Sequence, residues 1–185
     1  AVKKYADYYG VVCGKKTVFF TNNDSAYETA ISLNKKGLNV EAIIDIREKS
    51  DSELVKEVEK NGIQIYWSHT VVDTHGYKRL NEISIMPLSK DSMSVIKKKI
   101  SIKCDCLAIT GGWTPAVHLF TQSGGKLKFR EEDQVFLPNK SQSKQISIGS
   151  CNGDFELNKI FKNLLIKVKN FLKIENTEYD NLNIE

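Results

Sequence analysis

Apolar and polar residues alternate along the first third of the chain in runs that predict strands and helices in turn. The run Thr17–Thr21 is short, apolar and rich in β-formers, as a central parallel strand should be. A helical pattern follows it directly, with Ala26, Ala30 and Leu33 on one face and Gly37 just past the end. We expect strands at 17–21, 39–45 and 63–67, with helices at 24–36 and 51–60. Short loops between such elements indicate parallel strands joined by right-handed crossovers.

The pattern changes at about residue 70, where strands follow one another without helices. Three strands are expected at about 70–74, 80–86 and 95–103, and a buried strand over 106–110 runs into Gly111 and Gly112. Further on, the sequence predicts a hairpin at 126–129 and 135–137, a short buried strand at 146–149, and a helix at 155–172. Apolar residues recur along that last helix at helical spacing, so we expect the stripe to be core.

These elements predict an α/β fold: a Rossmann-like, three-layer domain with a parallel sheet, helices and an inserted β-meander. Residues 1–16 are expected to be a lead-in segment. Residues 17–112 would form an NAD(P)-binding-like domain with its meander at about 70–103, residues 113–172 a return segment of a neighbouring dinucleotide half, and residues 173–185 a tail.

Charge, hydropathy and cysteine content disfavour several classes of function. The net charge of +4 is mild and the lysines are scattered, which disfavours a nucleic-acid partner. No apolar run approaches the roughly 20 residues of a membrane span, and no signal peptide is recognisable, so we expect a cytoplasmic protein without a membrane partner. The four cysteines form no C-x-x-C pair and the three histidines complete no metal spacing, so free thiols and no metal are expected.

The candidate binding site centres on the turn after the first strand. This strand–turn–helix corner has the layout of a phosphate-binding corner, yet the three glycine positions of G-x-G-x-x-G carry Thr21, Asn23 and Ala26. Asp45 ends the next strand, where such folds place an acid for the adenosine ribose; it could equally cap the following loop. The full candidate set for cofactor binding is Thr21, Asn22, Asn23, Asp24, Ser25, Asp45, Thr110, Gly111, Gly112, Gly149, Asn152 and Gly153. No catalytic constellation is visible.

Four stretches together carry a resemblance to a known family: FTNNDSAYETA, THGYKRL, CLAITGGWTPAVHLFTQSGGKL and IGSCNG. They resemble the α subunit of heterotetrameric sarcosine oxidase, from about Tyr5 to Phe161. The resemblance implies an internal piece of a longer subunit, with a Gly-rich dinucleotide half upstream and a folate-type aminomethyltransferase-like half downstream.

The resemblance also implies an activity. The family complex demethylates sarcosine oxidatively to glycine, produces hydrogen peroxide and passes the one-carbon unit to tetrahydrofolate. It contains FAD, FMN and NAD, and its partners are the β, γ and δ subunits. The α subunit holds NAD, while sarcosine is oxidised at the FAD of the β subunit, so this chain alone should be inactive. Related opine oxidases and amino-acid dehydrogenases share the architecture, which leaves the substrate open.

The altered turn suggests that this half does not bind a dinucleotide in the standard manner. Asn23 places a side chain against the expected pyrophosphate, and Asp24 adds a like charge at the helix start. NAD would then sit in the upstream half, with 110–112 and 149–153 closing over it, and this piece would carry no cofactor of its own. Two alternatives are a turn that still cradles phosphate and a ligand-free scaffold for subunit assembly. An independent disulfide reductase is disfavoured, since no redox cysteine pair exists.

Overall fold

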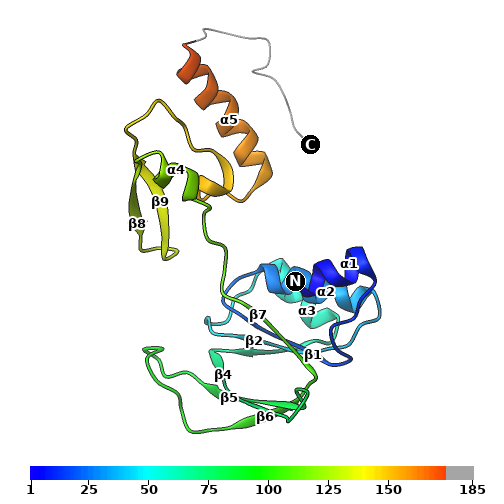
Figure 1. Ribbon diagram of the computed structural model, residues 1–185. Coiled ribbons are helices and arrows are strands. Elements are labelled where there is room, and N and C mark those ends of the chain that lie inside the picture. The colour runs from blue at the N-terminus through cyan, green and yellow to red at the C-terminus, as the bar shows by residue number, and fades with distance from the viewer. Residues whose placement is uncertain (174–185) are drawn as a thin grey trace. The chain divides into compact units, whose positions relative to one another are not determined.

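The computed structural model describes residues 1–173 and divides into two compact units (Figure 1). The first unit comprises Ala1–Gly112, and the second begins at Trp113.

A parallel four-stranded sheet forms the centre of the first unit. Its strand order is β3-β2-β1-β7, and the strands are β1 (Thr17–Thr21), β2 (Val40–Asp45), β3 (Gln64–Trp67) and β7 (Cys106–Thr110). The register places Thr21 between Asp45 on β2 and Thr110 on β7. Three strand ends that are far apart in sequence therefore meet at one edge of the sheet.

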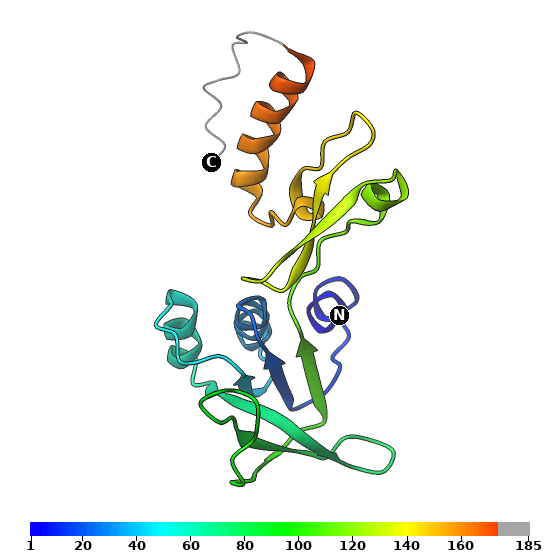
Figure 2. The ribbon, with the colours of Figure 1, turned by 90° about the vertical axis from the view of Figure 1, so that its left-hand side faces the viewer.

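Helices cover one face of this sheet (Figures 1 and 2). They are α2 (Ser25–Lys35) and α3 (Glu53–Lys60). The Ser52 hydroxyl caps α3 by accepting a hydrogen bond from the Val55 N–H. Apolar residues of both helices pack with the strands into one buried cluster, which includes Phe19, Tyr27, Ala30, Ile31, Leu33, Ile43, Val55 and Val58.

The opposite face is covered by an antiparallel sheet of order β4-β5-β6. Its strands are β4 (His69–His75), β5 (Glu82–Pro87) and β6 (Ile100–Lys103). Ile83 and Ile85 of β5 pack with Val18 and Ile44 in a second buried cluster. The α/β class and the three-layer order with an inserted meander, predicted from the sequence, are confirmed.

A helix that the sequence did not predict, α1 (Val2–Tyr9), lies in the lead-in segment. Val2 and Ala6 pack against the helical core, whereas Tyr5, Tyr8 and Tyr9 stay exposed. After α1, the backbone N–H groups of Lys15 and Lys16 donate to the Asp105 carboxylate, at 2.9 and 2.7 Å. These two bonds lower the pKa of Asp105 and fasten the lead-in to the start of β7.

The second unit contains the helix α4 (His118–Gln122), the hairpin β8 (Lys126–Arg130) and β9 (Val135–Lys140), the 3-10 helix η1 (Gly149–Asn152) and the helix α5 (Leu157–Leu172). Its buried apolar residues include Phe120, Val135 and Leu137. The strand expected at 146–149 is wrong: these residues pair with no strand, and Gly149 begins η1 instead. Among the described residues, the sheet of this unit contains β8 and β9, and residues 146–149 pair with neither of them.

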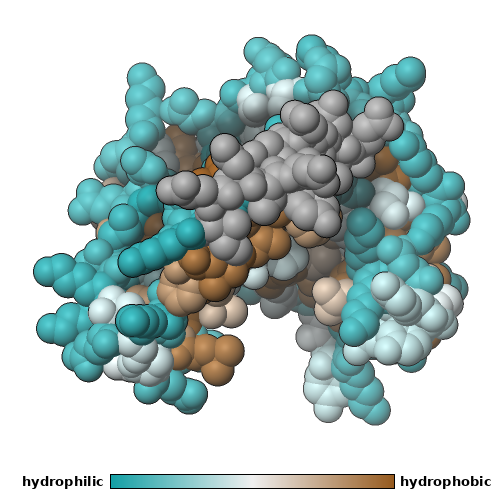
Figure 3. Space-filling view, turned by 90° about the horizontal axis from the view of Figure 1, so that it is seen from above, coloured by the Kyte–Doolittle hydropathy of each residue, from teal (hydrophilic) through white to brown (hydrophobic). Residues whose placement is uncertain are grey.

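The expectation that the α5 stripe is core is also wrong for this unit. No residue of α5 is buried, and Leu157, Ile166 and Leu172 are more than half exposed. The helix packs against η1, a single turn, which is too small to cover a 16-residue helix. Figure 3 shows hydrophobic side chains, in brown, at the molecular surface.

The strand β7, expected to be buried, is only half-buried. It lies at the edge of the parallel sheet, and Ile109 is 68% exposed.

In residues 1–173, no helix is long and apolar enough to cross a membrane.

Candidate functional site

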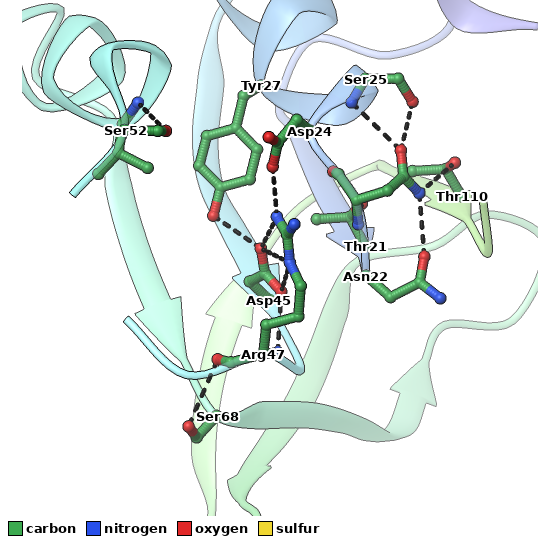
Figure 4. Close-up of polar contacts among 12 residues, drawn as sticks. Thr21, Asn22, Asp24, Ser25, Tyr27, Asp45, Arg47, Ser52, Ser68 and Thr110 are labelled. Atoms are coloured by element: carbon green, nitrogen blue, oxygen red, sulfur yellow. Dashed lines mark hydrogen bonds and ion pairs between the residues drawn. The ribbon is translucent and has the colours of Figure 1, made fainter. Parts of the chain in front are cut away.

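The candidate site lies where β1, β2 and β7 end and α2 begins (Figure 4). Nine of the twelve candidate residues belong to this corner: Thr21, Asn22, Asn23, Asp24, Ser25, Asp45, Thr110, Gly111 and Gly112. In open α/β sheets, ligands bind outside the carboxyl ends of the strands. The corner therefore has the position of a ligand site, and its side chains decide whether a ligand fits.

Asn23 closes the turn with its own side chain. Its Oδ1 accepts hydrogen bonds from the Ser25 backbone N–H, at 3.2 Å, and from the Ser25 hydroxyl. Its Nδ2 donates to Asn22 Oδ1 at 2.9 Å and to Thr110 Oγ1 at 3.2 Å. The Asn23 carboxamide thus fills the space in front of the first turn of α2.

Asp24 occupies the N-cap position of α2 without capping it. Its carboxylate instead accepts a hydrogen bond from Arg47 Nη2, at 2.8 Å. The side chain of Asp24 is 56% exposed, so this ion pair faces solvent. The bond ties the phosphate-type turn to the loop that follows β2.

Asp45 is fully buried and fully partnered. It accepts from the Tyr27 hydroxyl at 2.8 Å, from the Arg47 backbone N–H at 2.9 Å and from Arg47 Nη2 at 2.8 Å. Arg47 Nε contacts both carboxylate oxygens, at 3.1 and 3.2 Å. A buried carboxylate requires such partners, because burial without them is strongly unfavourable.

The pKa values of the two partner groups follow from this packing. Burial raises the pKa of the Tyr27 phenol above its ordinary value, and the hydrogen bond to Asp45 raises it further. The hydrogen bond to Asp45 raises the pKa of the Arg47 guanidinium. Tyr27 therefore stays neutral and donates, while Arg47 stays charged.

Thr110, Gly111 and Gly112 line the other side of the turn. The Gly111 carbonyl accepts a hydrogen bond from Asn22 Nδ2 at 3.2 Å. Gly112 has a φ of +101°, which disfavours any side chain. The backbone conformation alone therefore explains why a glycine stands at this position, and no ligand is needed to explain it.

The remaining candidates, Gly149, Asn152 and Gly153, lie in the second unit. Gly149 and Asn152 bound η1, and Gly153 is its C-cap residue. The structure brings these three together with one another.

Sequence reasoning missed Tyr27 and Arg47. In the sequence, Tyr27 looks like one more apolar position of the helix α2. In the structure it is buried, and its ring is stacked on that of Trp67, with 6.0 Å between the two ring centroids. Arg47 lies outside any periodic element, but its guanidinium also sits 6.0 Å from the Tyr27 ring. The spacing Asp-x-Arg at the end of a strand was the one available signal.

The corner does not fit a dinucleotide bound in the standard way. A pyrophosphate would meet the Asn23 carboxamide and the Asp24 charge, and a ribose hydroxyl would find the Asp45 oxygens already bonded. In the part of the chain that the structure describes, no three His, Cys, Asp or Glu side chains gather as a metal would need.

Several known proteins are similar to this chain. No protein-family model matches the chain. The chain is 32% identical over 158 residues to the sarcosine oxidase subunit alpha of Corynebacterium sp. strain P-1, and 28% identical over 158 residues to that of Rhizobium meliloti strain 1021. These matches cover 84% and 82% of the chain, but only 16% and 14% of the relatives.

Solved structures share the fold. The thioredoxin reductase of T. acidophilum is similar with a TM-score of 0.50 and 21% identity, over 75% of this chain and 47% of that one. LpdA from Mycobacterium tuberculosis is similar with a TM-score of 0.56 and 10% identity, over 92% and 37%. The resemblance stated from the sequence is thus confirmed: over most of its length, this chain is a relative of one segment of sarcosine oxidase alpha subunits, built on a Rossmann-like oxidoreductase fold.

Proposed function

We propose that the chain is a dinucleotide-type domain of the alpha subunit of a multisubunit amine oxidase that demethylates sarcosine. The observation that carries this proposal is the 32% identity to a sarcosine oxidase alpha subunit over 158 residues. The chain spans about a sixth of that relative, so the activity belongs to a larger assembly.

The reaction requires groups that this chain does not supply. In the assembly, FAD accepts electrons from the amine, and FMN and NAD complete the cofactor set. Tetrahydrofolate takes the one-carbon unit, and the partners are the beta, gamma and delta subunits of a cytoplasmic heterotetramer. In this proposal the amine is oxidised at the FAD of a partner subunit, and this chain contributes structural positioning.

The NAD of the assembly does not occupy the corner at Thr21–Ser25. The internal bonds of Asn23, Asp24 and Asp45 support this assignment. NAD instead lies in a separate Gly-rich half of the subunit, with the segments at 110–112 and 149–153 as candidate contacts.

A second candidate function is a ligand-free scaffold for subunit assembly. Exposed apolar residues on α5 favour it, because Leu157, Ile166 and Leu172 are more than half exposed. Mass spectrometry of the purified and denatured 185-residue chain tests it: a nucleotide released from this chain alone would exclude a ligand-free scaffold.

The test is an activity assay on the full-length subunit, purified with its partner subunits. Sarcosine should produce hydrogen peroxide with the assembly and none with the 185-residue chain alone. Opines and other secondary amines form the comparison panel. An assembly that oxidises one of those amines and not sarcosine would replace the proposed substrate, and peroxide from the isolated chain would overturn the proposal.

A further inference from the structure

Two hydrogen-bond donors at the corner could hold an anion, and both already have an acceptor within the chain. The Ser25 backbone N–H, at the start of α2, donates to Asn23 Oδ1 at 3.2 Å. Arg47 Nη2 donates to Asp24 Oδ1 at 2.8 Å. Backbone N–H groups at helix starts and guanidinium groups are the usual phosphate partners in proteins.

The Arg47 guanidinium is held from two sides that differ in burial. Asp45 holds it from within, and Asp45 is fully buried. Asp24 holds it from outside, with 56% of its side chain exposed. Loss of Asp24 would therefore leave Arg47 in place, with one N–H free toward solvent.

The net charge of the corner also disfavours the binding of a phosphate. Asp24 and Asp45 together outweigh Arg47 by one negative charge. A phosphate would approach a corner of its own sign, where close like charges repel.

We propose that Asn23 and Asp24 are specificity-determining residues that exclude phosphate-bearing ligands, nucleotides included, by standing in for the phosphate. Asn23 Oδ1 takes the place of an anion oxygen at the helix start, and the Asp24 carboxylate takes the place of an anion on Arg47. This inference rests on the proposed function, since it explains why a dinucleotide-type corner in such a subunit holds none.

Substitution of Asn23 and Asp24 should therefore allow a phosphate to bind at the corner. Asp24→Ala removes the charge without loss of a cap, because the Asp24 side chain makes no N-cap bond. Asn23→Gly combined with Asp24→Ala also frees the Ser25 N–H. Isothermal titration of the 185-residue chain with ADP should show at least about tenfold tighter binding by the double variant than by the wild type.

Glu28→Ala is the matched control. Glu28 lies in the first turn of the same helix and is exposed, so its removal makes the same change in charge. It should leave ADP affinity within about twofold of wild type. Arg47→Lys added to the double variant should cancel the gain, because a single ammonium cannot bridge two oxygens as the guanidinium does.

Three results would overturn the proposal: binding of ADP by the wild-type chain, an equal gain in Glu28→Ala, or no gain in a double variant that retains its thermal unfolding transition. If the double variant does not fold, Asp24→Asn, which keeps the side-chain shape, should give a smaller gain in its place, and no gain there would also reject the proposal. The readout is ligand binding by this chain, so it is independent of whether the assembly oxidises sarcosine.

Discussion

Hydrogen bonds from Tyr27 and Arg47 converge on the buried carboxylate of Asp45, and these contacts decide what each residue at the corner can do. The same carboxylate stands where a dinucleotide fold would offer an acid to a ribose. At the residue scale, the corner is therefore satisfied by its own chain, and substitution of the groups that hold Asp45 should lower stability.

Arg47→Met should lower the free energy of unfolding by about 2 to 3 kcal/mol, since it leaves Asp45 charged and buried without its main partner. Because the Arg47 side chain is partly exposed, the loss of stability should be smaller than the largest losses seen when fully buried ion pairs are broken. Urea denaturation measures it. The control is Lys56→Met, which breaks an exposed ion pair with Glu53 and should change stability by less than about 1 kcal/mol. Asp45→Asn in the Arg47→Met background should restore part of the loss; equal effects of Arg47→Met and Lys56→Met would contradict the account.

Tyr27→Phe gives a prediction that depends on pH. The folded-state pKa of Tyr27 is raised, so its hydrogen bond stabilises the fold fully below the unfolded pKa of about 10 and less as pH rises above it. The wild type should exceed Tyr27→Phe by about 1.5 kcal/mol near neutrality. That difference should shrink above about pH 10. Urea midpoints of both proteins across this range provide the measurement, and a difference that stays constant would show that Tyr27 does not titrate as the packing requires.

The sequence predicted which residues lie at the corner, but not the residues to which they are hydrogen-bonded. The turn follows from the strand–turn–helix pattern, and Asp45 and Thr110 follow from the ends of two further predicted strands. Nine of the candidates meet, as parallel topology predicts. The internal bonds could not be predicted, because Arg47 lies past the end of β2 and its direction depends on tertiary packing.

At the element scale, periodicity predicted the strands and helices well where other elements of the chain cover the apolar face. The pattern of α2 matches its buried face, and that of β5 matches the packed meander. The same pattern failed for α5 and for β7, because periodicity shows that a face is apolar and not what covers it. The segment at 146–149 failed for a related reason, since a short apolar run becomes a strand only beside a partner strand.

The turn between β4 and β5 offers a test at this scale. Gly76 has a φ of +152°, and a Cβ there would lie 1.9 Å from the Arg79 carbonyl oxygen. Gly76→Ala should destabilise the chain by about 2 to 4 kcal/mol, since backbone must move. Gly37→Ala is the matched control: Gly37 also has a positive φ, but no atom lies within 4 Å of its Cβ position, so about 1 kcal/mol is expected. Thermal unfolding monitored by circular dichroism compares the two, and equal losses would mean that the loop relaxes freely.

At the scale of the whole molecule, the chain consists of two units and corresponds to about a sixth of its sarcosine oxidase relatives. The first unit keeps the three layers of a dinucleotide-type domain, including the strand ends and the helix start of its ligand corner. Asn23, Asp24 and Arg47 occupy that corner with internal bonds. The first unit thus keeps the architecture of a nucleotide site, and we propose that it binds no nucleotide there.

The most direct measurement is isothermal titration of the wild-type 185-residue chain with NAD. The account predicts no detectable heat of binding at ligand concentrations up to the millimolar range. Sub-millimolar binding of NAD by the chain alone would contradict it, and would mean that the Asn-Asn-Asp turn still cradles phosphate.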